Sequence, residues 1–315
     1  MRVFSGGDMK RAVITGAGGF IGKNLIERLL RENIQVYGID IEAVQERIPT
    51  GSNITPLSMD ITDKRALANI LKTAKPDVFY HLAWQGVSTD VKNEISIQLA
   101  NISLAIAALE ACAEAGCGHI IIPGSASEYA YCGQTIDGKN VLSPGDAYAA
   151  SKAAAQILCQ WYARQHELNL NWLLIGSIYG PGRNDSNILT YTIRALLHGE
   201  EPKYSKLEQL WDYIYIDDLI EALYLVGLYG KPNKVYPVGS GKARPLAEYI
   251  EQIRAVIAPG APLEIGVLPY KFGNRPDNSV LDIRSLREDT GFTPKISFGE
   301  GIRRTIRYFK ETEGA

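Results

Sequence analysis

The chain has 315 residues, a formal net charge of −2 and a hydrophobic content of 46%. That length is enough for one large or two modest domains with a buried core, and the composition excludes wholesale disorder. Proteins that bind nucleic acid or anionic membranes usually carry a basic excess, so the charge argues against nucleic acid and membrane as main partners.

Residues 1–11 contain glycine, aspartate and lysine but no apolar stretch of the kind found in signal peptides, and we expect them to form a loose leader. The sequence contains no run of about 18 apolar residues that would predict a membrane-spanning helix. Four cysteines are too few for a disulfide scaffold and lack the spacing of a zinc site, so we expect no metal and a cytoplasmic location: Cys112, Cys117, Cys132 and Cys159.

The first half of the chain alternates short apolar runs with longer helical patterns. Strands are predicted at residues 11–15, 35–40, 78–83, 119–123 and 172–176, and helices at about 19–32, 95–115 and 147–165. Because the strands are continuously apolar and separated by helices, we expect an α/β fold of Rossmann type, a doubly wound parallel sheet with helices on both faces.

The composition of the sequence changes after about Tyr179, where prolines and glycines cluster and the helical patterns become shorter. We therefore expect a smaller C-terminal substrate-binding lobe, formed by about residues 179–209 and 246–315. Residues 12–178, together with about 210–245, are predicted to form the dinucleotide-binding domain.

A glycine-rich turn follows the first predicted strand and leads directly into a helix. It reads Gly16-Ala-Gly-Gly19-Phe20-Ile21-Gly22. Glycines in such a turn permit close approach of a pyrophosphate to the backbone, and the amides at the helix start face the anion. The position at the first strand-to-helix junction predicts a dinucleotide site.

Asp40 ends the second predicted strand, about twenty residues after the turn. A carboxylate at this place accepts hydrogen bonds from ribose hydroxyls and repels the 2′-phosphate of NADP, so NAD is favoured over NADP. Asp60 and Ile61 follow the third apolar run and are predicted to lie beside the adenine.

Tyr148 and Lys152 are four residues apart on a helical pattern and therefore share one face. A free tyrosine has a pKa near 10, and a nearby ammonium would favour its phenolate form. Ser125, just after a predicted strand, can hold the same reacting oxygen. We predict Ser125, Tyr148 and Lys152 to be the catalytic residues.

With these motifs in place, the sequence resembles the extended short-chain dehydrogenase/reductases that modify nucleotide sugars, over nearly the whole chain. The matching segments are the glycine turn, Asp40, His81-Leu82-Ala83, Asn101, Gly124-Ser-Ala-Ser-Glu-Tyr129, Tyr148-Ala-Ala-Ser-Lys152, Tyr179-Gly-Pro-Gly182, Trp211-Asp-Tyr-Ile-Tyr-Ile-Asp-Asp218 and Arg275.

The resemblance implies a role for each of these residues. Tyr148 would exchange a proton with a sugar oxygen, Ser125 would hydrogen-bond that oxygen, and Lys152 would hold the nicotinamide ribose. Leu82 and Ala83 would lie under the nicotinamide. The expected substrate contacts are Trp84, Ser125, Ser127, Ser177, Arg183 and Arg275. The family also implies a homodimer formed through the helix at 147–165.

Three departures from the family pattern bear on the reaction. Ala126 and Ser127 stand where dehydratases carry an Asp-Glu pair, which argues against 4,6-dehydration. Trp211 and Ser177 replace an arginine and an asparagine associated with diphosphate binding. The third departure, Gly124-Ser-x-x-Glu128-Tyr, resembles reductases of 4-keto-6-deoxy sugar nucleotides.

From these departures we expect an NAD(P)-dependent oxidoreductase that transfers hydride at a sugar carbon, C4 by preference, of a nucleotide-diphosphate sugar, with the 4-keto-6-deoxyhexose reductase favoured. The alternative is a 4-epimerase that retains NAD, a cofactor choice that fits Asp40. Oxidation of a nucleotide sugar or a simple polyol is a further option. A non-catalytic NAD(H)-binding protein is the remote alternative.

Overall fold

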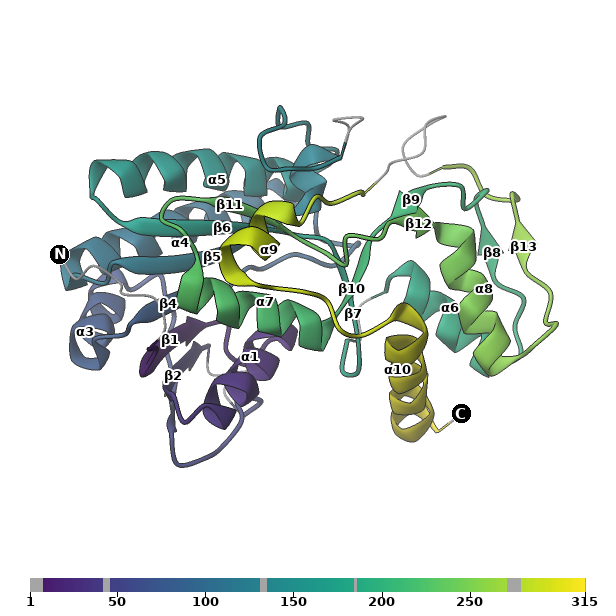
Figure 1. Cartoon of the computed structure of the whole chain (residues 1–315), viewed down its shortest axis with the longest axis horizontal. Helices are drawn as coiled ribbons and strands as arrows, with labels where there is room; N and C mark the ends of the chain where they lie inside the picture. Colours follow the sequence, from purple (N-terminus) through teal and green to yellow (C-terminus); the bar gives the residue numbers. More distant parts are fainter. Residues whose placement is uncertain (1–7, 42–45, 131–134, 184–185, 271–278, 315) are drawn as a thin grey trace.

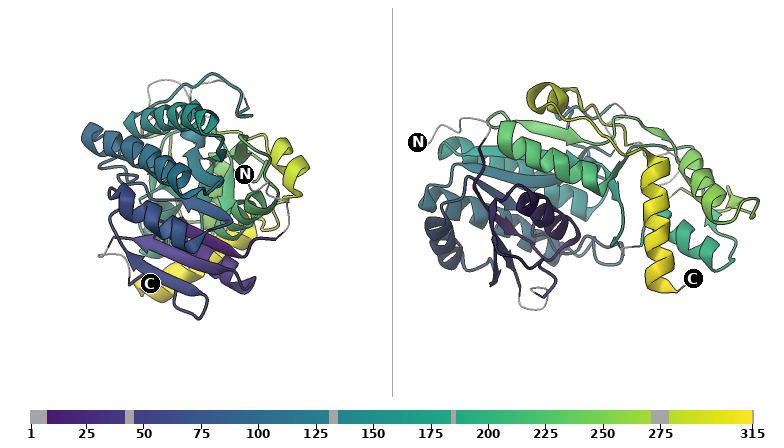
Figure 2. Two further views of the ribbon diagram at one scale, coloured as in Figure 1. Left: turned by 90° about the vertical axis from the view of Figure 1, so that its left-hand side faces the viewer. Right: turned by 60° about the horizontal axis from the view of Figure 1, so that its bottom comes forward.

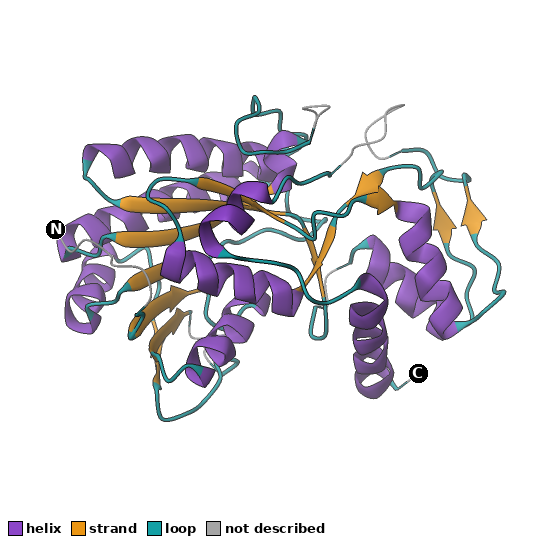
Figure 3. Cartoon of the chain, in the orientation of Figure 1, coloured by secondary structure: helices purple, strands orange, loops and turns teal. Residues whose placement is uncertain are grey.

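The central feature of the computed structural model is a parallel sheet with the strand order β11-β6-β5-β4-β1-β2-β3 (Figures 1 and 3). The structure describes residues 8–41, 46–130, 135–183, 186–270 and 279–314. The strands are β1 (Arg11–Thr15), β2 (Gln35–Asp40), β3 (Ile54–Ser58), β4 (Val78–His81), β5 (His119–Ser125), β6 (Asn169–Ile175) and β11 (Val235–Val238). The predicted Rossmann-type α/β fold is therefore confirmed.

Helices cover both faces of this sheet, as Figure 2 shows from the side and from below. One face carries α3 (Lys64–Ala74), α4 (Ile95–Ala115) and α5 (Ala147–Gln165), which pack side by side. The opposite face carries α1 (Phe20–Arg31) and α7 (Ile216–Tyr229), with α9 (Arg284–Thr290) against α7 and β11. The helices shield both faces of the inner strands, so most residues of β1, β4, β5 and β6 are apolar and buried, whereas the edge strand β3 is partly exposed.

The order of the strands places the ligand crevice. β1 pairs with β2 on one side and with β4 on the other, so consecutive crossovers leave in opposite directions at this point. In open parallel sheets the crevice forms beyond the carboxyl ends of the strands at such a switch point. Thr15 and His81 are opposite one another in the register and mark that edge.

The predicted strand boundaries differ from the structure for local polar reasons. β6 begins at Asn169, three residues before the predicted start at Trp172. Asn171 is a polar residue inside this buried strand, and it is accommodated because His119 and the carbonyl of Lys231 hydrogen-bond its amide. β4 ends at His81 rather than Ala83, whose amide turns toward the Thr15 hydroxyl at 3.4 Å.

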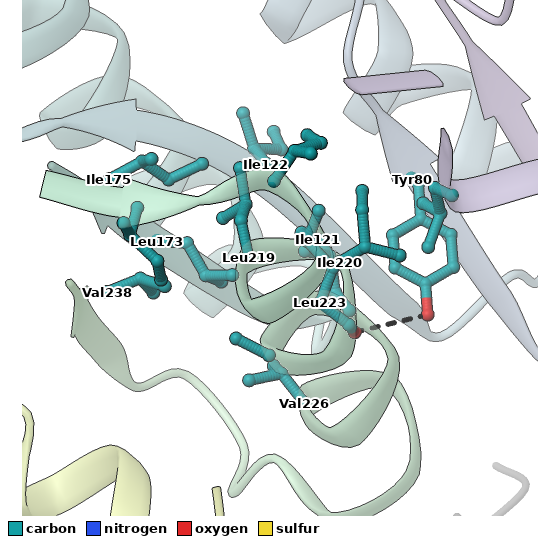
Figure 4. Packing of buried hydrophobic residues seen from close by; sticks show 14 of the residues in the cluster. Tyr80, Ile121, Ile122, Leu173, Ile175, Leu219, Ile220, Leu223, Val226 and Val238 are labelled. Carbon is teal, nitrogen blue, oxygen red and sulfur yellow. Dashed lines mark hydrogen bonds between the residues drawn. The ribbon is translucent and has the colours of Figure 1, made fainter. Parts of the chain in front are cut away.

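The core beneath the sheet is formed mainly by the apolar face of α7 (Figure 4). Leu219, Ile220, Leu223 and Val226 face Ile121, Leu173, Ile175 and Val238 of the strands, whereas Ile122 points to the other side of the sheet. The Tyr80 hydroxyl donates a hydrogen bond of 3.3 Å to the carbonyl of Leu223. Gly227 leaves room for that hydroxyl, which would overlap a Cβ at this position.

α4 is long and apolar enough by composition to cross a membrane, although the sequence contains no uninterrupted apolar run. Its polar residues alternate with apolar ones, and the helix packs between α3 and α5. Ala105, Ala108, Leu109 and Cys112 are fully buried in the core. α4 is thus a core helix of the fold.

The C-terminal part of the chain forms a smaller region beside the sheet (right side of Figure 1). Its helices are α6 (Ile188–Leu197), α8 (Leu246–Ile257) and α10 (Phe298–Glu313). Its short strands pair as β7 (Ser177–Tyr179) with β10 (Tyr213–Tyr215), β8 (Lys203–Tyr204) with β13 (Glu264–Ile265), and β9 (Leu210–Trp211) with β12 (Arg244–Pro245). Tyr249 of α8 packs edge-on against Phe298 of α10, with 4.6 Å between the centres of the two rings.

We predict that Gly227→Ala destabilises the protein, although alanine favours a helix by up to about 1 kcal/mol. The new methyl group must displace the buried Tyr80 hydroxyl, and overpacking of this kind costs about 1 to 3 kcal/mol. Denaturant unfolding measures the free energy of unfolding. The double variant Tyr80→Phe/Gly227→Ala removes the clash and should recover most of the loss; no recovery would show that the steric explanation is wrong.

Candidate active site

Two glycines of the predicted nucleotide turn are required by close backbone contacts. Gly16 has a φ of +68°, and a Cβ there would lie 2.8 Å from the amide nitrogen of Ala83. A Cβ on Gly22 would overlap the carbonyl oxygen of Gly16. The turn therefore joins the ends of β1 and β4 to the first turn of α1, where Phe20 and Ile21 are half-buried.

The N-terminus of α1 is open toward the crevice. Its N-cap residue is Gly19, which has no side chain to satisfy the first amides of the helix. Such amides, at the positive end of the helix dipole, are suited to bind an anion. This geometry fits a pyrophosphate group lying across the turn.

Asp40 connects the carboxyl end of β2 to the glycine turn. Its Oδ2 accepts a hydrogen bond of 2.8 Å from the amide of Gly18, and its Oδ1 accepts one of 2.9 Å from the amide of Ile41. Each carboxylate oxygen has a second lone pair available. Asp40 can therefore hold the turn and still accept a hydrogen bond from a ribose hydroxyl.

A cavity of about 270 Å³ brings together most of the predicted cofactor residues. It is lined by Gly16, Gly19, Asp40, Asp60, Ile61, Leu82 and Ala83, together with Arg47 and Trp84. Asp60 lies two residues beyond the end of β3. The residue between them, Met59, still donates a backbone hydrogen bond to the carbonyl of Asp40, so Asp60 is held next to the end of β2. The residues present fit a dinucleotide.

The loop after β4 is held by two buried amides of α4. Asn101 pairs with Gln85 in both directions, accepting from its amide at 2.9 Å and donating to its carbonyl at 2.8 Å. Gln98 donates to the carbonyl of Gly86 at 2.8 Å and accepts from the Trp84 indole at 3.3 Å. Gln98 is not among the residues predicted from the sequence. Two side-chain amides three residues apart on an apolar helix, Gln98 and Asn101, nevertheless indicate a buried polar contact.

His81 is a core residue and not a ligand-binding group. It is buried, and its Nδ1 lies 2.9 Å from the hydroxyl of Thr15. Burial, together with the charge of Lys152, lowers the pKa of His81 to about 3. The imidazole is therefore neutral at physiological pH.

Tyr148 lies in the first turn of α5, which is held in place by its N-cap residue, Asp146. Asp146 caps the helix by accepting from the amide of Ala149 at 2.9 Å, and it forms an ion pair with Lys92. The Tyr148 hydroxyl interacts with that of Ser125. Burial raises the pKa of Tyr148 to about 12, and the hydrogen bond with Ser125 opposes that rise.

Lys152 is buried one helical turn further on, and its ammonium contacts a backbone carbonyl and an indole ring. Its Nζ donates to the carbonyl of Pro123 at 2.8 Å and lies 3.5 Å from the centre of the Trp84 ring. Among the charges that act on the phenol, Glu128 and Asp146 raise the pKa of Tyr148 and Arg183 lowers it. The effect expected of Lys152 together with a bound nicotinamide stays a prediction.

A second, larger cavity of about 860 Å³ lies between the sheet and the C-terminal region. The structure brings four of the predicted substrate residues to its wall, namely Ser125, Ser127, Ser177 and Arg183. Trp84 lines the cofactor cavity instead, since its ring covers the Lys152 ammonium. Arg275 lies outside the described residues.

Trp211 and Ser177, the two residues that depart from the family pattern for diphosphate binding, contact each other. The indole of Trp211 donates a hydrogen bond of 2.6 Å to the hydroxyl of Ser177, and both residues line the larger cavity. Nearby, the guanidinium of Arg183 donates to the carbonyl of Ile178. The wall therefore offers an indole face at this point, with Arg183 close by.

Among residues 8–41, 46–130, 135–183, 186–270 and 279–314, no group of three or more His, Cys, Asp or Glu side chains could hold a metal ion. Cys112, Cys117 and Cys159 are buried free thiols, and Cys132 lies outside the described residues.

Known proteins of similar sequence and structure include sugar-nucleotide enzymes. The UDP-glucose 4-epimerase of Mycolicibacterium smegmatis is 27% identical over 312 residues, covering 95% of this chain and 98% of that protein. The human dTDP-D-glucose 4,6-dehydratase is 23% identical, covering 97% and 91% respectively. The structure of the Thermus thermophilus UDP-glucose 4-epimerase complex with NAD superimposes with a TM-score of 0.82 at 25% identity, covering 96% and 99%.

A family model described as the NAD dependent epimerase/dehydratase family matches residues 12–239, which is more than half of the chain. This span includes the glycine turn, Asp40, Ser125, Tyr148 and Lys152. The resemblance seen in the sequence is thereby confirmed, as is the prediction of an NAD-dependent enzyme. The chain belongs to the NAD dependent epimerase/dehydratase family.

Proposed function

We propose that the protein is a nucleotide-sugar 4-epimerase that retains NAD through turnover. The observation that carries this proposal is the place of Tyr148 between the two cavities: its hydroxyl interacts with Ser125, which lines the larger cavity, and its ring contacts that of Trp84, which lines the cofactor cavity. The related 4-epimerases support this reading over the reductase favoured from the sequence alone. Ala126 and Ser127, in place of an Asp-Glu pair, argue against the dehydratase.

The chain's own residues would handle the proton of the sugar hydroxyl. Tyr148 would accept that proton as the sugar is oxidised and return it as the sugar is reduced, while Ser125 donates a hydrogen bond to the same oxygen. When bound, NAD supplies a centre that accepts and returns hydride. Gly16, Gly22 and Asp40 would hold it, and Lys152 would place its charge beside the nicotinamide ribose.

We also propose that the C-terminal segments at about 179–209 and 246–315 bind the nucleotide part of the substrate. Tyr191, Tyr204 and Leu246 contribute to the wall of the larger cavity, which Ser125 also lines. The free thiols of the described cysteines support a cytoplasmic location, because disulfides persist mainly in oxidising compartments.

A homodimer through α4 and α5 is the oligomeric state that we propose. Ile157, Leu158 and Trp161 on α5 are between 44% and 55% exposed, and Ile95 and Leu99 on the neighbouring α4 are 61% and 58% exposed. Apolar side chains gathered on two adjacent helices are unfavourable in water. A second copy of the chain would cover them by packing the same two helices.

We expect Tyr148→Phe to lower the rate of C4 epimerisation by about 10²-fold or more, because the proton acceptor is lost. The assay uses UDP-glucose, UDP-glucuronate and their C4 epimers, and titration calorimetry measures whether NAD binding is retained. Tyr162→Phe on the same helix is the matched control and should keep the wild-type rate.

Other outcomes of this assay would replace the proposal. Consumption of NADH or NADPH with a 4-keto-6-deoxy sugar nucleotide, without epimerisation, would establish the reductase. NAD binding without any turnover, unchanged in Tyr148→Phe, would indicate the non-catalytic NAD(H)-binding protein.

The position of Asp40 leads us to expect that the purified protein carries NAD and binds NAD⁺ at least about tenfold more tightly than NADP⁺, because the carboxylate repels a 2′-phosphate. Mass spectrometry of the extracted cofactor and calorimetric titration measure this. Asp40→Asn keeps an acceptor for the Gly18 amide but removes the charge, so the difference in affinity between NAD⁺ and NADP⁺ should become smaller. A preference for NADP⁺ in the unaltered protein would show that the interpretation of Asp40 is wrong.

The proposed dimer predicts that Trp161→Glu yields monomers, because a charge would be buried in the interface. Light scattering after size-exclusion chromatography measures the mass. Tyr229→Glu is the control, since Tyr229 is similarly exposed, at 45%, at the end of α7 on the opposite face of the sheet. A monomeric unaltered protein would contradict the proposal.

A further inference from the structure

A carboxylate is buried directly beneath the proposed catalytic residues. Glu128 lies in the short 3₁₀ helix η1 (Ala126–Tyr129) and has no exposed surface. A buried carboxylate is costly unless it is paired or fully hydrogen-bonded, so its presence here requires an explanation. The reaction described above assigns it no role.

One oxygen of Glu128 fixes the backbone of Ser125. Its Oε1 accepts a hydrogen bond of 2.6 Å from the Ser125 amide and one of 3.3 Å from the indole of Trp172. The Ser125 hydroxyl in turn accepts from the amide of Ser127 at 3.2 Å, so serine and glutamate cap η1 reciprocally. The other oxygen, Oε2, has no hydrogen-bond donor within the described residues.

The chain reserves space for this carboxylate at Gly124. A Cβ at this position would overlap the indole nitrogen of Trp172 and would lie 2.6 Å from Oε1 of Glu128. Gly124 has an unexceptional backbone, so its small size and not its flexibility is what the site uses. Gly124 is thus explained by the Trp172 indole and the Glu128 carboxylate that hydrogen-bonds it, which together fill the space that a side chain would need.

The charge of Glu128 acts on Lys152. Burial lowers the pKa of the Lys152 ammonium, and the Glu128 carboxylate opposes that effect. Conversely, burial raises the pKa of Glu128, while Lys152 and the Ser125 amide favour its charged form. Each group therefore stabilises the ionised form of the other, although no direct ion pair links them.

The other titratable groups facing Lys152 carry no compensating charge. His81 on β4 is held neutral, with a pKa of about 3, and Cys159 on α5 stays protonated because burial raises its pKa to about 12. The carbonyl of Pro123 and the ring of Trp84 offer only partial charges to the ammonium. Within the described surroundings, Glu128 is the group that can supply the counter-charge.

From this arrangement we infer that Glu128 is a positioning residue of the active site, which fixes the Ser125 backbone and keeps the buried Lys152 ammonium charged. The inference rests on the proposed function in one respect, since it takes Ser125, Tyr148 and Lys152 to be the groups that act on the sugar. It adds a requirement of this chain, namely that the three residues work together with the buried carboxyl group of Glu128, whose pKa burial raises to about 7.

The test measures the charge of Lys152 directly, without a sugar substrate. The full chain is labelled with ¹³Cε-lysine, and the Lys152 signal is assigned as the one that Lys152→Met removes. We expect Glu128→Gln, which keeps an oxygen for the Ser125 amide, to lower the titration midpoint of Lys152 by about one to three pH units. An unchanged midpoint would overturn the inference.

Two further variants give the experiment its controls. Trp172→Phe removes one hydrogen bond to Glu128 but leaves its charge, so the Lys152 midpoint should move far less than in Glu128→Gln. If Glu128→Gln fails to fold, the reciprocal measurement replaces it: Lys152→Met should raise the midpoint of the Glu128 ¹³Cδ signal, because coupling between two sites is mutual. A Glu128 midpoint that does not rise would overturn the inference.

Activity gives a second and separable readout. If Lys152 must be charged, the rate declines as pH rises through its pKa, so Glu128→Gln should shift this alkaline decline to lower pH. A purely structural Glu128 would instead lower the rate equally at every pH. Failure to epimerise any UDP-sugar would refute the proposed function but leave the lysine titration unaffected, so the two failures are distinguishable.

Discussion

The close approach of three backbone segments at the end of β1 is the constraint on which the site depends. Gly16 touches the chain just beyond β4, and Gly22 brings α1 against the carbonyl of Gly16. Neither contact leaves space for a side chain. Because these contacts lie where the strand order changes direction, they place the amides of α1, the Asp40 carboxylate and the loop after β4 around one cavity.

The second half of the site is built by buried polar groups that hold loops in place. Asn101 and Gln98 fix the segment after β4, Asp146 fixes the start of α5, and Glu128 fixes Ser125. Each group is shielded from water, so each hydrogen bond is costly to lose. The hydroxyls that we propose to contact the substrate, those of Ser125 and Tyr148, are attached to the sheet through these contacts.

Electrostatics at the site depend on burial more than on neighbouring charges. Burial raises the pKa of Tyr148 and lowers that of Lys152, and both shifts oppose the charged forms that proton transfer requires. Glu128 opposes the shift at Lys152, and Ser125 opposes the shift at Tyr148. A bound nicotinamide with its positive charge would favour the phenolate, which makes cofactor binding a condition for the chemistry.

Local patterns in the sequence determined the fold class, because strand and helix periodicity is encoded within short segments. Residue spacing within such segments also singles out the glycine turn, Asp40 and the Ser125–Tyr148–Lys152 set as the predicted site. What the sequence could not show depends on residues far apart in the chain. The ammonium of Lys152 turns to Pro123 and Trp84, the indole of Trp211 meets Ser177, and the β6 boundary depends on partners for Asn171. Only the tertiary structure decides these contacts, since it alone sets which distant groups become neighbours and which are withdrawn from water.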